Sequence, residues 1–370
     1  MVGSFATHSD SKHDLPTDSI CRLRSGCKDV NHSGMKLRSR AARLAASLSV
    51  LASVSLASVS GADLRLGLIG LDTSHVTAFT KLLNDSKSKD HIPGARVVVA
   101  FKGGSRDIES SISRVEGYTK ELQQTYGVRI LDSIEEVCRE VDAVLLTSVD
   151  GRTHLEQARP VLRARKPVFI DKPAAGSLRD AIALYRLAKA LKVPLFSCSS
   201  YRFYDSLVEL KRADVGELKG VFSYGPAPTE PHHPDLFWYG IHPTEALFTI
   251  LGPDCQTVSR TTTPAMDVVT GIWTEGRLGV LTGLRTGHTP HRVTLFGTKA
   301  IAEQKGGGDY APMLREVIKF FQTGIAPVSP EETLAIMTFM EAADESKREG
   351  GKPVSMKQVL EKNDPGKVLE

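Results

Sequence analysis

Leu64-Arg-Leu-Gly-Leu-Ile-Gly70 is a short apolar run that ends in a glycine. This pattern is typical of a buried strand that stops at a tight turn. The next segment, Thr77–Asn84, has its apolar residues at helical spacing, and Ala95–Phe101 is a second apolar run. The stretch therefore predicts a strand, a helix and a second strand in close succession, as at the start of an α/β domain.

Strands and helices continue to alternate up to residue 200. We expect further strands at Asp142–Ser148, Pro167–Ile170 and Pro194–Ser197, and helices at Thr119–Tyr126, Ser133–Glu140, Leu155–Arg163 and Leu178–Leu191. Alternation at this short spacing predicts a parallel, doubly wound sheet, so residues 63–200 are expected to form a Rossmann-like domain.

The pattern changes after Tyr201. We expect successive strands without intervening helices at Val221–Tyr224, Thr257–Thr262, Asp267–Trp273, Gly279–Arg285 and Arg292–Phe296, followed by helices at Ala311–Thr323 and Glu331–Arg348. This order predicts a C-terminal α+β domain over residues 201–370 with a mostly antiparallel, open sheet, and a domain boundary near residues 199–203.

The N-terminal segment has the composition of a targeting signal. Residues 1–34 are polar and are expected to be disordered or untranslated. From Met35, a positively charged segment precedes the uncharged stretch Leu44–Val59 and the small residues Ser60-Gly-Ala62. This order is that of a secretory signal peptide, so residues 35–62 are expected to be removed on export to the periplasm or the cell exterior. The apolar stretch is short for a permanent membrane span.

The overall composition is that of a globular protein of about two domains. The chain has 370 residues, of which 41% are hydrophobic and 24% are charged, and its net charge is +4. Lys and Arg are scattered, which argues against a nucleic-acid partner. The five cysteines show neither a metal-ligand spacing with histidine pairs nor a disulfide framework, so no metal site is predicted.

The loop after the first strand reads Gly70-Leu-Asp-Thr-Ser-His75. The dinucleotide-binding fingerprint has glycines at its first, third and sixth positions. Here Gly70 is present, but Asp72 and His75 stand at the other two positions. A carboxylate at position 72 would repel a pyrophosphate, although Thr73, Ser74 and the helix N-terminus could still donate hydrogen bonds. Alternatively, Asp72 caps the helix.

The end of the second strand carries no acidic residue to bind ribose hydroxyls. Lys102, Ser105 and Arg106 would suit a 2′-phosphate instead, which favours NADP over NAD as a cofactor. A solvated loop is the alternative interpretation of the same residues.

Four later segments occur in a characteristic order. Asp171-Lys-Pro173 follows the strand at 167–170 and is preceded by Asp150-Gly-Arg-Thr-His154; Tyr201-Arg-Phe203 and Trp238-Tyr-Gly-Ile-His-Pro-Thr-Glu245 come later. With these segments the chain resembles the Gfo/Idh/MocA family of glucose–fructose oxidoreductases and inositol dehydrogenases over residues 64–350. The resemblance implies an NAD(P)-dependent oxidoreductase that acts on a sugar, sugar derivative or polyol by hydride transfer.

The resemblance also implies roles for individual residues. Lys172 would hold the substrate hydroxyl and His242 would exchange its proton, chemistry that an ammonium group and an imidazole can perform near pH 7. The cofactor side would comprise Gly70, Asp72, Thr73, Ser74, His75, Lys102, Asp150, His154 and Lys172. The substrate side would comprise Tyr201, Arg202, Trp238, Tyr239 and Glu245. A homo-oligomer formed through the open sheet face is implied in the same way.

Two departures from the family pattern keep other functions open. Trp238 stands where the family commonly has an aspartate four residues before the catalytic histidine, and Asp235 and Glu245 are candidate replacements. Together with Asp72, this substitution favours as alternatives an exported sugar-binding protein without redox turnover, or a redox-neutral lyase or hydrolase with a retained cofactor.

Overall fold

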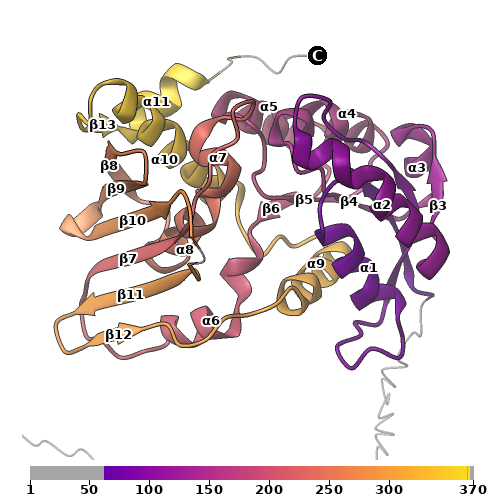
Figure 1. Cartoon of the computed structure of the whole chain (residues 1–370), viewed down its shortest axis with the longest axis horizontal. Helices are drawn as coiled ribbons and strands as arrows, with labels where there is room; N and C mark the ends of the chain where they lie inside the picture. The colour runs from indigo at the N-terminus through magenta and orange to yellow at the C-terminus, as the bar shows by residue number, and fades with distance from the viewer. Residues whose placement is uncertain (1–61, 288, 365, 367–370) are drawn as a thin grey trace, which may run out of the picture. The chain divides into compact units, whose positions relative to one another are not determined.

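Six parallel strands form the first sheet, in the order β3-β2-β1-β4-β5-β6 (Figure 1). The strands are β1 (Leu64–Ile69), β2 (Ala95–Phe101), β3 (Arg129–Leu131), β4 (Ala143–Leu146), β5 (Val168–Asp171) and β6 (Leu195–Cys198). This order is that of a doubly wound sheet, and the chain reverses direction between β1 and β4. Ligands of such sheets bind at the carboxyl ends of the strands near that reversal. The predicted Rossmann-like sheet is therefore confirmed.

The computed structural model describes residues 62–287, 289–364 and 366, which belong to one unit. The interpretations of residues 1–34 and of the signal peptide at 35–62 fall outside the described residues, apart from Ala62. Within the described part, no helix is both long and apolar enough to span a membrane. Cys138, Cys198 and Cys255 are buried and free, as expected for small core residues.

The helices of the first domain match the predicted segments with one large difference. They are α1 (His75–Asn84), α2 (Glu109–Tyr126), α3 (Ile134–Glu140), α4 (His154–Arg163) and α5 (Leu178–Leu191). The helix predicted to begin at Thr119 begins at Glu109, because its first turns bury little apolar surface and so show no apolar period. The short edge strand β3 was not predicted, since only three residues pair there.

The second sheet has seven strands in the order β12-β11-β7-β10-β9-β8-β13. These are β7 (Leu218–Pro226), β8 (Cys255–Thr262), β9 (Met266–Trp273), β10 (Leu278–Leu284), β11 (Arg292–Gly297), β12 (Ile301–Glu303) and β13 (Val354–Ser355). All neighbours are antiparallel except β7 and β10, which run parallel. The predicted, mostly antiparallel sheet is confirmed.

The expectation that no helices interrupt these strands was wrong. Helices α7 (Asp235–Tyr239) and α8 (Ile241–Leu251) lie between β7 and β8 in the chain, and α8 packs on β7 and β10. Most of α8 is buried, so its residues lack the polar face from which a helix is recognised in sequence. The remaining helices are α6 (Asp205–Lys211), α9 (Ala311–Thr323), α10 (Pro330–Arg348) and α11 (Met356–Asn363).

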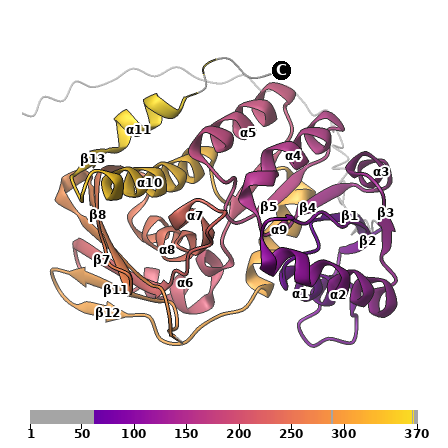
Figure 2. The same cartoon turned by 45° about the horizontal axis from the view of Figure 1, so that its top comes forward.

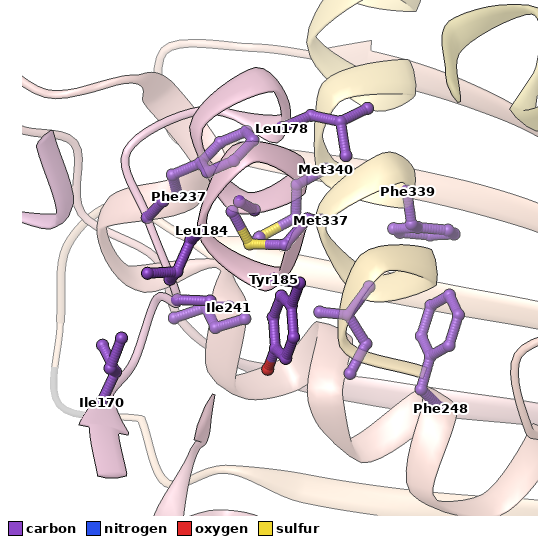
Figure 3. Close-up of a cluster of buried hydrophobic side chains, with 14 of the residues drawn as sticks. Ile170, Leu178, Leu184, Tyr185, Phe237, Ile241, Phe248, Met337, Phe339 and Met340 are labelled. Atoms are coloured by element: carbon purple, nitrogen blue, oxygen red, sulfur yellow. The ribbon is translucent and has the colours of Figure 1, made fainter. Parts of the chain in front are cut away.

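Helices from both halves of the chain share one apolar core. Side chains of α5, α7, α8 and α10 interdigitate there, among them Tyr185, Phe237, Phe248 and Met337 (Figure 3). Because this core joins the two sheets through buried apolar surface, the elements that carry the candidate site are held in a fixed arrangement.

Helix α9 packs on the first domain although it follows the second sheet in the chain. Its Phe320 ring lies 4.7 Å from the ring of Phe196 on β6, which in turn lies 5.1 Å from Phe169 on β5. Figures 1 and 2 both show α9 beside α1, whose Phe79 belongs to the same buried cluster. Residues 201–370 therefore do not all belong to the second domain in space, because α9 returns to complete the first.

Candidate active site

Gly70 makes a tight turn at the carboxyl end of β1. Its φ is 88°, a conformation that favours glycine, and a Cβ at this position would lie 2.4 Å from the backbone nitrogen of Ser148. Gly103, after β2, has φ 61° and approaches Gly70 closely. The first glycine of the fingerprint is thus required by the packing of the loops that follow β1, β2 and β4.

The Asp72 side chain lies inside the protein and does not cap α1. Its side chain is fully buried and accepts hydrogen bonds from the hydroxyl of Ser111 (2.7 Å) and the backbone N–H of Val149 (2.9 Å). Burial raises the pKa of this carboxyl, against the effect of these hydrogen bonds. The carboxylate does not cap α1 either, because the N-cap residue is Ser74 and makes no side-chain capping bond. Through these hydrogen bonds, Asp72 instead links α2 and the loop after β4 to the loop after β1.

His75 at the third fingerprint position binds the acidic residue of the Asp-Lys-Pro motif. Its Nδ1 is hydrogen-bonded to Asp171 Oδ2, while Asp171 Oδ1 accepts the backbone N–H of Lys172 (2.9 Å). Burial opposes ionisation of Asp171, but the charge and hydrogen bond of His75 hold its pKa below the usual range. The His75 ring also packs 4.7 Å from the ring of Tyr310.

Three other residues predicted on the cofactor side hold loops together. Lys102 forms an ion pair with Glu116 (2.8 Å). His154 is fully buried, and its two ring nitrogens lie 2.9 and 2.8 Å from the carbonyl oxygens of Pro173 and Ser148.

Asp150, the third of these residues, is also buried. It accepts hydrogen bonds from the hydroxyl of Ser105 and from Arg152. None of the described contacts joins Lys102, Asp150 or His154 to the Lys172 ammonium group, and their hydrogen bonds and ion pairs hold neighbouring loops together.

Lys172 lies at the end of β5 and faces the second domain. Its Nζ is 5.5 Å from the centroid of the Tyr239 ring, within range of a cation–π interaction. Burial lowers the pKa of the Lys172 ammonium group, and the charges of Asp171 and Asp72 oppose that effect. The predicted catalytic lysine and the predicted substrate residue Tyr239 are therefore adjacent.

His242 lies in the first turn of α8, next to Tyr239. Their ring centroids are 5.0 Å apart, and His242 Nδ1 shares a 2.7 Å hydrogen bond with Ser199 Oγ. Burial and, to a smaller extent, the charge of Lys172 place the pKa of His242 well below its usual value. The imidazole is therefore neutral at pH 7, with one nitrogen fixed by a serine.

Neither acidic residue proposed as a partner of His242 contacts it. Asp235 is hydrogen-bonded to Arg260 (3.0 Å) and to Lys347. Glu245 accepts bonds from Arg202 Nε (2.8 Å) and from the backbone N–H of Ser199 (2.9 Å). Ser199 takes the place of the expected acid and links the imidazole to the carboxylate of Glu245.

The other predicted substrate residues are mostly engaged elsewhere. Arg202 is buried between Glu245 and Glu332. The Tyr201 hydroxyl donates to Gln304 Oε1 (2.6 Å). Trp238 is partly buried, with its ring 5.1 Å from that of His233.

Two histidines near the site were not predicted. His291 precedes β11, and its ring lies 5.3 Å from His242 and 5.1 Å from Tyr201. His233 is buried, with its Nε2 3.9 Å from Asp150 Oδ1. Neither has a sequence spacing that links it to the first domain, so only the fold reveals their positions.

The resulting candidate active site comprises Lys172, Tyr239, His242 and His291. It combines an ammonium group that can stabilise negative charge on oxygen with a neutral imidazole that can accept a proton. Within residues 62–287 and 289–364, no group of three or more His, Cys, Asp or Glu side chains could hold a metal ion.

Residues 65–198 match the model of a protein family described as an oxidoreductase family with an NAD-binding Rossmann fold. Among curated proteins, the chain is 32% identical over 159 residues to inositol 2-dehydrogenase 2 of Mycolicibacterium vanbaalenii. The match covers 42% of this chain and 41% of that protein, so the chain spans less than half the length of this relative.

Solved structures match over most of the chain. One is myo-inositol 2-dehydrogenase from Lactobacillus plantarum, with a TM-score of 0.67 and 15% identity over 79% of this chain and 99% of that one. Another is an oxidoreductase from Agrobacterium radiobacter in complex with NAD+, with a TM-score of 0.65 and 16% identity over 80% of this chain and 99% of that one. At these identities the likeness shows a shared fold for both domains.

Proposed function

We propose that this chain is a nicotinamide-dependent oxidoreductase of the Gfo/Idh/MocA type that converts a sugar or polyol carbinol to a carbonyl, since residues 65–198 match the model of that family's NAD-binding domain. The observation that carries the proposal is the convergence of Lys172, Tyr239 and His242. Lys172 comes from the first domain and the other two from the second, at the sheet edge where ligands of this fold bind.

The loop after β1 fits the pyrophosphate of a nicotinamide dinucleotide. Gly70 provides the turn, and Asp72 points into the protein, where its carboxylate is bound by Ser111 and Val149. Ser74, the N-cap residue of α1, makes no side-chain capping bond, although Thr73 Oγ1 accepts the backbone N–H of His75. The Ser74 hydroxyl and the first-turn amides that are not engaged by Thr73 could hold a phosphate. Lys102 pairs with Glu116 and so does not favour NADP, and either NAD or NADP could serve as the cofactor.

The side chains of the site can accept the proton that leaves the carbinol hydroxyl group. In the oxidation direction, the carbinol O–H proton goes to His242 Nε2 while Nδ1–H donates to Ser199 Oγ. The Lys172 ammonium group stabilises the developing negative charge on the oxygen. The bound nicotinamide ring would accept the hydride that leaves the carbinol carbon.

Direct binding and turnover test this proposal. The purified protein would be assayed for co-purified nicotinamide nucleotide, titrated with NAD, NADH, NADP and NADPH, and then assayed with polyols. We expect submillimolar binding of at least one nucleotide, and loss of turnover without unfolding in Lys172→Ala and His242→Ala. Binding of none would contradict the redox function and favour the sugar-binding alternative.

We propose in addition that residues 35–62 direct export of the chain. The support is the order of charged, apolar and small residues in that segment. N-terminal sequencing of exported material should give Asp63 as the first residue. A product that still carries residues 35–62 would contradict this proposal.

A further inference from the structure

We propose that His291 is a substrate-binding residue of the candidate active site, whose Nε2–H donates a hydrogen bond to a hydroxyl or carbonyl oxygen of the polyol bound beside His242. This inference rests on the proposed function. It adds a residue that neither the sequence motifs nor the family resemblance assigns.

The position of His291 places it at the substrate side of the site. It immediately precedes β11, which pairs with β7 in the second sheet. Its ring packs against those of His242 and Tyr201, at centroid distances of 5.3 and 5.1 Å. A ligand in contact with His242 therefore lies within reach of the His291 side chain.

The space for the His291 ring depends on a glycine in β7. A Cβ at Gly225 would lie 2.0 Å from His291 Nδ1, so no larger residue can stand there unless the ring moves. Gly225 is not among the glycines with positive φ, and backbone conformation does not explain its presence. Its role is to admit the imidazole.

The same contact selects the tautomer of His291. Nδ1 is buried and has no hydrogen-bond partner among the residues that the structure describes. The ideal Cβ direction at Gly225 is also the direction of one of its Cα hydrogens, which therefore points at Nδ1. A proton on Nδ1 would meet this hydrogen, whereas a lone pair accommodates it. The ring must consequently carry its proton on Nε2, which is not among the three ring atoms nearest to the Cβ position at Gly225.

Neither ring neighbour of His291 has a described hydrogen bond to it. The Tyr201 hydroxyl is engaged by Gln304, and His242 Nδ1 is engaged by Ser199. Burial lowers the pKa of His291 to about 4, so the ring stays neutral and keeps a single N–H at pH 7. A neutral donor of this kind suits the uncharged oxygens of a polyol or a ketose.

The first experiment measures polyol binding by calorimetry, with and without nicotinamide nucleotide, using myo-inositol and D-glucose as probes. His291→Ala should weaken binding of the accepted probe about 5- to 10-fold, the effect of one neutral hydrogen bond. His232→Ala is the matched control, because this histidine is exposed and its contact is with Glu230. It should bind as wild type does, and both variants should keep the wild-type melting temperature.

A double-mutant cycle tests the role of Gly225. Gly225→Ala should weaken binding in the wild-type background by displacing the ring, and should have no further effect in His291→Ala. Additive losses would overturn the link between the two residues. A second measurement needs no substrate: 15N–1H NMR of the imidazoles should show His291 with unprotonated Nδ1 and protonated Nε2 from pH 5.5 to 7.5. An Nδ1–H tautomer or an imidazolium at pH 6 would overturn the inference.

The outcomes separate this inference from the proposed function. If wild-type protein binds a polyol and His291→Ala binds it equally well, only the inference about His291 is wrong. If wild-type protein binds neither polyol nor nucleotide, the proposed function is wrong and the inference falls with it.

Discussion

His75 Nδ1 is hydrogen-bonded to Asp171, so the third fingerprint position and the motif acid hold each other across the carboxyl edge of the first sheet. A glycine at position 75 would leave this buried carboxylate without its partner. The histidine that stands in place of the third fingerprint glycine therefore has a structural role, because it binds the acidic residue of the Asp-Lys-Pro motif. This contact also fixes the backbone of Lys172, whose N–H binds the same carboxylate.

Replacing Asp171 should change the pH dependence of stability. Its pKa is lowered in the folded state, so its contribution to the free energy of unfolding is full above its unfolded pKa of about 4 and is lost as the pH falls through the folded pKa. In Asp171→Asn, this part of the decrease in the free energy of unfolding at low pH should be absent. Urea unfolding between pH 3 and pH 7 checks it, with Asp63→Asn, at an exposed position, as control. Equal pH slopes in wild type and Asp171→Asn would contradict the prediction.

Removing the hydroxyl of Ser199 should impair turnover more than substrate binding. Ser199→Ala leaves His242 Nδ1 without its 2.7 Å partner, so the ring loses the bond that orients it. We expect kcat to fall about 10-fold, less than the ~100-fold or larger loss expected for His242→Ala, with little change in KM. The limb of the kcat–pH profile that reports the ionisation of His242 should shift, since the bond to Ser199 affects the basicity of this imidazole. A fall in kcat accompanied by an equal rise in KM would argue for a general structural defect instead.

Arg260 should be essential for stability. Its guanidinium group is fully buried and pairs with Asp235 (3.0 Å), Asp267 (2.9 Å) and Asp344. Arg260→Met would leave buried carboxylates without their cation, a change that costs about 3–5 kcal/mol of unfolding free energy. Chemical denaturation measures this loss.

Arg348→Met is the control for that experiment. Arg348 pairs with Glu341 at the surface, so its removal should change stability by less than about 1 kcal/mol. Equal effects of the two substitutions would show that the buried network contributes no more than a surface pair.

The outer face of the second sheet is expected to mediate self-association. Phe222, Leu278 and Ile272 are exposed, and the register places them on one face, with Val280 opposite Phe222 and Ile272 opposite Leu278. A contiguous apolar face of this kind is typical of a protein interface. Phe222→Asp should shift the mass measured by light scattering toward that of the monomer. Ile325→Asp, an exposed apolar residue between α9 and α10, should not.

The elements best predicted from the sequence are those whose position is determined by an apolar run or an apolar period. The strands at residues 64–69 and 95–101 and the amphipathic helix α5 follow directly from their patterns. Helix α8 did not, because a helix buried on most sides has no polar stripe to mark its period.

The site was harder to predict because its partners are distant in the chain. The orientation of Asp72 is set by Ser111 and Val149, which lie 39 and 77 residues away. The partner of His242 is Ser199, 43 residues earlier, and not an acid on its own helix. Lys172 and His242 could be named from motifs, but what each side chain contacts depends on tertiary packing.

The return of α9 to the first sheet determines when that domain can finish folding during synthesis. Phe320 covers Phe196, which in turn packs against Phe169, so the ribosome must complete more than a hundred further residues before this face of the sheet is closed. A nascent chain that ends near residue 200 would expose these rings and would be prone to aggregation. The two halves of the molecule therefore complete their folding together. A fragment that ends near residue 200, and so contains the Gly70–His75 loop without α9, is expected to be insoluble.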